Sequence, residues 1–112
     1  QVVAAHPGAR YEIKVQEQYR NMKEILAGVP FVADYAEEAM RKAGLQPMRA
    51  IIRGGTDGSR LSFMGLPCPN IFTGEMAIHS KLEYVSVQDM EKAIDTLVEL
   101  VQIWKNHPWT QA

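Results

Sequence analysis

The sequence predicts an α/β fold in which helices pack on a small mixed sheet. In two long segments the apolar residues repeat with the helical period, and between them lie short segments that look like strands. Because strand and helix segments alternate along the chain, a layered α/β arrangement is expected. With 112 residues, the chain has the length of one ordinary domain or of part of one.

The first predicted elements are a strand and two helices. Apolar and polar residues alternate over residues 11–15, which indicates a half-buried strand. A short helix is expected from Asn21, its cap, to Gly28. The next helix has Pro30 in its first turn and stops at Gly44. Its apolar stripe consists of Val32, Tyr35, Ala36, Ala39, Met40 and Ala43.

Shorter elements fill the middle of the chain. Residues 48–52 are predicted as a strand that enters through a proline. A glycine-rich turn over residues 53–58 then leads into a short helix over residues 59–64. Residues 70–73 are predicted as a further strand, and residues 74–85 as a loop.

The last element is a long helix. Ser86 is its predicted N-cap, with Asp89 three residues on in the manner of a capping box. The helix is expected to end at His107 and Pro108. Its apolar stripe consists of Met90, Ala93, Ile94, Leu97, Val98, Val101 and Trp104.

Composition and charge exclude several classes of protein. Apolar residues make up 46% and charged residues 22% of the chain, as in globular proteins and unlike disordered ones. The formal net charge of −1 offers no attraction for nucleic acid or for an acidic membrane surface. No apolar run approaches the roughly 20 residues of a membrane span, and no signal peptide is visible. The single cysteine, Cys68, cannot form an internal disulfide, so a cytoplasmic location is expected.

The turn after the second predicted strand is the first candidate site. Gly54 and Gly55 allow another group to approach the backbone closely. Exposed N–H groups there, followed by a helix N-terminus, can bind an anion, and Arg53 can pair with a carboxylate. The alternative is a tight strand-to-helix turn with a solvated arginine. The stretch contains neither the P-loop lysine nor the GxGxxG pattern.

A second candidate is His79 in the predicted loop. A loop histidine can bind a metal or act as a general acid or base, although a surface or partly packed histidine is the alternative. Glu75 and Glu83 are the nearest carboxylates, but nothing in the sequence fixes their geometry. Cys68 is expected to be a packed small residue, and Asp57 is expected to cap a helix.

Three stretches of the chain resemble one family. The run RGGTDGSRLSFMGLPCPNIFTG, residues 53–74, is similar to the C-terminal signature of the peptidase T family. Those enzymes are cytoplasmic tripeptide aminopeptidases within the dizinc aminoacylase and carboxypeptidase family. Residues 11–26 resemble the last strand of that family's lid domain and the exit from it. Residues 79–93 resemble its loop into the last helix, so the resemblance covers about residues 11–104.

The resemblance implies a catalytic domain that holds two zinc ions and an inserted lid domain. Residues 1–20 would be the end of the lid domain, and residues 21–112 the C-terminal portion of the catalytic domain. His79 matches the family's C-terminal zinc ligand. Arg53 matches the residue that binds the substrate's terminal carboxylate, and the loop beside it is Gly54, Gly55 and Thr56. The general base and the other ligands would lie upstream, so no catalytic residue is assigned here and the segment alone is expected to be inactive.

One departure and three alternatives accompany this resemblance. The family loop usually reads Gly-Gly-x-x-x-His, often with Asn two residues before the ligand, whereas this chain reads Gly-Glu-Met-Ala-Ile-His over residues 74–79. The expected function is hydrolysis of the N-terminal residue from a tripeptide. The alternatives are a related dizinc deacylase, a carboxypeptidase, or a stand-alone α/β interaction module without catalysis. If the segment is separated from the sheet of a longer parent protein, it exposes a strand edge, and it is therefore expected to self-associate.

Overall fold

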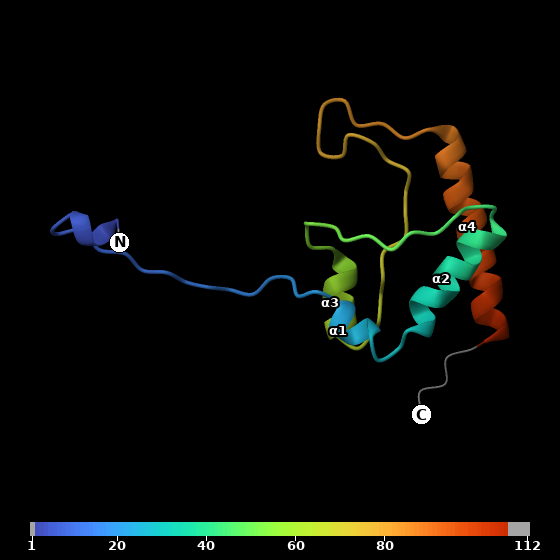
Figure 1. The fold of residues 1–112 in the computed structure, drawn as a ribbon, viewed down its shortest axis with the longest axis horizontal. Helices are drawn as coiled ribbons and strands as arrows, with labels where there is room; N and C mark the ends of the chain where they lie inside the picture. Colours follow the sequence, from blue (N-terminus) through green and yellow to red (C-terminus); the bar gives the residue numbers. More distant parts are fainter. Residues whose placement is uncertain (1, 108–112) are drawn as a thin grey trace.

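The computed structural model describes residues 2–107, which form helices joined by long irregular segments (Figure 1). Gln1 and residues 108–112 lie outside the described residues, and with them the predicted helix stop at Pro108 and the outer ends of the two predicted domains. In chain order the elements are the 3-10 helix η1 (Val3–Ala5) and the α-helices α1 (Lys23–Leu26), α2 (Phe31–Lys42), α3 (Asp57–Phe63) and α4 (Val87–Asn106).

The predicted sheet is wrong, and with it the α/β class. Within residues 2–107 the only strand-like pairing is one antiparallel bridge between Met76 and Tyr84. The segments predicted as strands, residues 11–15, 48–52 and 70–73, carry no inter-strand hydrogen bonds. A strand exists only where its N–H and C=O groups pair with a neighbour, and alternation specifies a face rather than a partner. The described part of the chain is therefore helical, not helices on a mixed sheet.

The prediction for α2 is confirmed. Pro30 precedes its first residue, and Gly44 has a φ of +80° just after its end. The N–H of Leu45 closes this end by donating to the carbonyl of Met40 at 2.9 Å. The buried residues of the predicted stripe are Val32, Ala36, Ala39 and Ala43.

The start of α4 is also confirmed. The backbone N–H of Asp89 donates to Ser86 Oγ at 3.0 Å, and this hydroxyl donates to Asp89 Oδ2 at 2.7 Å. α2 and α4 pack side by side (Figure 1), where Thr96 and Ile103 of α4 are buried. The predicted stripe is mostly on another face, and its exposed members are Met90, Ile94, Leu97, Val98 and Val101.

A second small unit surrounds α3. The hydroxyl of Ser59 donates to the carbonyl of Arg20, and the guanidinium of Arg20 lies 4.5 Å from the ring centroid of Phe63. The hydroxyl of Ser62 accepts the backbone N–H of Cys68 at 3.0 Å. α3 is thereby held between Arg20 on one side and the turn at Cys68 on the other.

The molecule is extended, because within residues 2–107 only α2 with α4 and α3 with its surroundings are packed together. Its radius of gyration is 19.8 Å, whereas a compact chain of this length measures about 13 Å. Its accessible surface is 9485 Å², against about 6,200 Å² for a compact protein of this mass. The N-terminal residues, which include η1, run far from α2 and α4 (Figure 1), and Val15 is 91% exposed. No helix within residues 2–107 is long and apolar enough to cross a membrane.

Candidate functional site

The first candidate segment, residues 53–56, lies immediately before α3. Arg53 is exposed, and its guanidinium forms no ion pair or hydrogen bond with another described residue. Thr56 is the N-cap of α3 in extended conformation, and its hydroxyl accepts a hydrogen bond from Asn70 Nδ2 at 3.1 Å. The capping predicted for Asp57 is not seen, because Asp57 is the first residue of α3 and the N-cap, Thr56, makes no side-chain capping bond. What remains available to a ligand is the charge of Arg53.

The glycines of this segment have unequal surroundings. A side chain at Gly54 would meet nothing within 4 Å, whereas a Cβ at Gly55 would overlap the ring of Tyr19. The guanidinium of Arg60, from α3, lies 5.4 Å from the centroid of the same ring. Tyr19 therefore holds the loop at Gly55, and only glycine fits this contact. The backbone at Gly54 is open beside Arg53.

The second candidate, His79, lies at the tip of a closed loop. Met76 N donates to Tyr84 O at 2.8 Å and Tyr84 N donates to Met76 O at 3.2 Å, which closes the loop's base. Ser80 N donates to Ala77 O at 3.2 Å and forms a tight turn. His79 is the third residue of this turn, with a φ of +63°. That value has the sign of a type II turn, where glycine is usual.

The sequence identified Glu83 only as a carboxylate near His79, and the structure shows which atom of His79 it contacts. Its Oε2 atom accepts the backbone N–H of His79 at 2.6 Å. The bond engages the amide of His79, so the imidazole keeps both ring nitrogens without a described partner. The four-residue spacing between His79 and Glu83 was visible, but in an irregular loop it has no fixed geometry.

The loop is anchored to α4 near its beginning. Gly74 has a φ of +80°, and a Cβ placed on it would lie 2.9 Å from Asp89 Cγ. Asp89 is itself bonded to Ser86 at the start of α4. Close packing of Gly74 on Asp89 therefore fixes where the loop leaves the preceding segment, and only glycine suits that position.

The donor set fits one ligand of a zinc ion rather than a complete site. Catalytic zinc takes three protein ligands from histidine, carboxylate or thiolate groups. Within residues 2–107 no three such groups lie close enough together to hold a metal ion. His79, with an exposed imidazole that is free to bind through nitrogen, fits as a single ligand.

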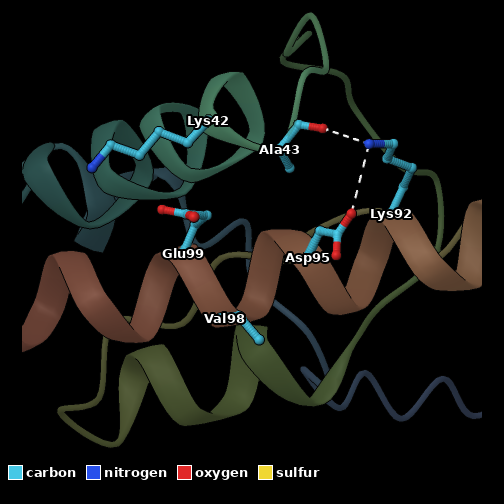
Figure 2. A pocket seen from close by; sticks show the side chains of 6 residues that line it. All are labelled: Lys42, Ala43, Lys92, Asp95, Val98 and Glu99. Atoms are coloured by element: carbon cyan, nitrogen blue, oxygen red, sulfur yellow. Dashed lines mark hydrogen bonds and ion pairs between the residues drawn. The ribbon is translucent and has the colours of Figure 1, made fainter.

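The structure does not bring the two candidates into contact. Within the part of the chain that the structure describes, no hydrogen bond or ion pair joins Arg53 to residues 74–85. A shallow depression of about 260 Å³ lies elsewhere, between α2 and α4, and contains none of the predicted site residues (Figure 2). It is open to solvent, and its Lys92 is already bonded to Ala43 O and Asp95 (Figure 2). This depression therefore adds nothing to the site.

Comparison with known proteins gives one consistent result. The chain is 46% identical over 98 residues to a protein named Peptidase T from Escherichia fergusonii, covering 88% of this chain and 24% of the relative. Proteins of the same name from Shewanella pealeana and Clostridium perfringens are 50% and 47% identical over 95 and 92 residues, covering 85% and 82% of this chain. Each of these two matches covers 23% of the relative. No family model matches the chain.

Proposed function

We propose that the chain is the C-terminal segment of a zinc-dependent tripeptide aminopeptidase. The premise is the resemblance to the peptidase T family, which is confirmed over a segment that spans about a quarter of the length of the curated relatives. The observation that carries the proposal is the 43–50% identity to proteins named Peptidase T. The exposed, turn-held imidazole of His79 supports it further. The free thiol of Cys68 suits the cytoplasmic location that we also propose.

The proposal assigns two roles within this segment. His79 would bind one of two zinc ions as a neutral imidazole. Bound zinc supplies Lewis acidity toward the scissile carbonyl and lowers the pKa of a bound water. Arg53, which has no partner among the described residues, would hold the terminal carboxylate of the tripeptide beside Gly54, Gly55 and Thr56. A single histidine is too few ligands for catalysis, so we propose that the segment alone is inactive.

The role of Arg53 is tested by kinetics of the full-length protein. Arg53→Ala is expected to raise KM for a tripeptide about 10–100-fold, because a hydrogen bond to a charged group is worth about 1.5–3 kcal/mol. Zinc content should not change. Arg10→Ala is the matched control, since Arg10 is also exposed and unpaired among the described residues. An unchanged KM in Arg53→Ala refutes the assignment.

The role of His79 is tested by metal content. His79→Ala in the full-length protein is expected to lose zinc and most tripeptidase activity. His6→Ala is the control, because His6 is another exposed histidine and lies outside the loop. Full zinc occupancy in His79→Ala, measured by elemental analysis, contradicts the ligand assignment.

Three alternative functions are distinguished by simple measurements. Rates of hydrolysis of tripeptides, of acylated amino acids and of peptides cleaved at their C-terminal residue separate a tripeptidase from a related deacylase or carboxypeptidase. A stand-alone module that self-associates is favoured by one feature, the exposed apolar side chains of α4, such as Val101 at 68% and Ile94 at 59%. Activity of the full-length protein on tripeptides would dismiss that module.

A further inference from the structure

We propose that Glu83 is a positioning residue that holds the turn bearing His79 in the conformation that presents its imidazole to zinc. This inference rests on the proposed function, because it acts through His79 as a metal ligand. It assigns Glu83 no direct contact with metal or substrate. Its basis is the backbone geometry of residues 76–84 and a single hydrogen bond from a carboxylate.

The backbone around His79 is strained. Two non-glycine residues have positive φ, with +52° at Ala77 and +63° at His79. L-residues in this region crowd Cβ against the backbone, although histidine enters it more often than most. Such conformations persist where surrounding contacts enforce them, and they cluster at functional sites. The turn therefore needs interactions that hold it.

Glu83 supplies the interaction that acts on His79 itself. The bridge between Met76 and Tyr84 closes the base of the loop, and the bond from Ser80 to Ala77 closes the turn. Neither engages an atom of His79. The bond from His79 N to Glu83 Oε2 does so, at 2.6 Å, and its acceptor is a carboxylate, which makes it stronger than a neutral bond.

The position of this bond leaves the ring free for a metal. Partners that orient a metal-ligating histidine usually accept from its second ring nitrogen. Here the carboxylate accepts from the main chain instead, so Glu83 fixes where the Cα–Cβ bond points rather than which tautomer is present. Loss of comparable outer partners weakens metal binding about 10–100-fold.

The test compares zinc affinity in variants of the full-length protein, measured by competition with a chromophoric chelator. Glu83→Ala removes the acceptor, whereas Glu83→Gln retains a carbonyl acceptor without the charge. Glu75→Ala is the matched control, because Glu75 is an exposed glutamate in the same loop with no bond to His79. Hydrogen exchange at the His79 amide and the thermal midpoint are measured in parallel.

Glu83→Ala is expected to weaken zinc binding about 10–100-fold and to speed exchange at the His79 amide, while Glu83→Gln recovers a large part of the affinity. Equal losses in both variants overturn the positioning role, because they indicate that the charge itself is required. Wild-type affinity in Glu83→Ala overturns it too, and leaves the proposed function standing if His79→Ala loses zinc. If His79→Ala keeps zinc, the proposed function itself fails. Should Glu83→Ala fail to fold, Glu83→Gln and the exchange rate still decide.

Discussion

Replacing Gly58 with alanine should destabilise α3, although alanine is the better helix former. Intrinsic propensity alone favours the substitution by up to about 1 kcal/mol. A Cβ at Gly58, however, would overlap the carbonyl oxygen of Cys68 and lie 3.2 Å from Asn70 Oδ1. The first of these is a backbone atom that cannot rotate away, and overpacking of this kind costs about 1–3 kcal/mol. The net expectation is a loss of about 1 kcal/mol of local stability.

Hydrogen exchange of the α3 amides measures this loss directly, because it reports the free energy of local opening. The amides of Ser62 and Phe63 should exchange about fivefold faster in Gly58→Ala, which corresponds to about 1 kcal/mol. Gly28→Ala is the matched control, since its new Cβ would meet only Ile25 O at an ordinary 3.5 Å. Slower exchange in Gly58→Ala would refute the packing of α3 on the turn at Cys68.

Three further predictions concern the two long helices. Lys92→Met keeps the aliphatic stem but removes the 2.8 Å bond to Ala43 O at the end of α2, so stability should fall by about 1 kcal/mol; an unchanged thermal midpoint would show that this bond contributes nothing. A hydrogen bond from Arg49 holds the pKa of the half-buried Glu37 below its ordinary 4.5. Because the folded-state pKa of Glu37 is depressed, the stabilisation that this carboxylate gives the fold is present above pH 4.5 and is lost as the pH falls through the folded value. NMR titration should show that Arg49→Gln returns the pKa of Glu37 toward 4.5. An unchanged pKa would contradict the pairing of Arg49 with Glu37. The chain itself should self-associate through the exposed face of α4, and Ile94→Glu should weaken that association in sedimentation experiments; a wild-type chain that stays monomeric at high concentration contradicts this.

The sequence predicted those features that depend on residues close together in the chain. The cap at Ser86 and the stop at Gly44 were both correct, because a cap involves three or four neighbouring residues and a positive φ needs only a glycine. The strands failed for the opposite reason. The alternation over residues 11–15 describes side chains that suit a sheet, but pairing requires a second strand, and none lies beside them among the described residues.

The apolar stripe of α4 shows the same limit. Its period correctly predicted a helix, yet the residues buried against α2 are Thr96 and Ile103, neither of which belonged to the predicted stripe. Helical periodicity identifies an apolar face but not the surface that covers it. Thr96 fits the helix contact because its hydroxyl is satisfied within α4, donating to Lys92 O at 2.8 Å.

The conformation of the loop that carries His79 depends both on neighbouring residues and on contacts made across the loop. Ala77 stands where the resembling family often has asparagine, and the φ of +52° at this position gives a physical reason for that preference. Asparagine enters the left-handed region readily, whereas alanine brings no side-chain hydrogen bond that would stabilise it. With alanine in place, the conformation depends more heavily on contacts made across the loop, which are the bridge from Met76 to Tyr84 and the bond from His79 to Glu83. The departure from the family pattern thus makes Glu83 more important in this chain than the spacing of its sequence suggests.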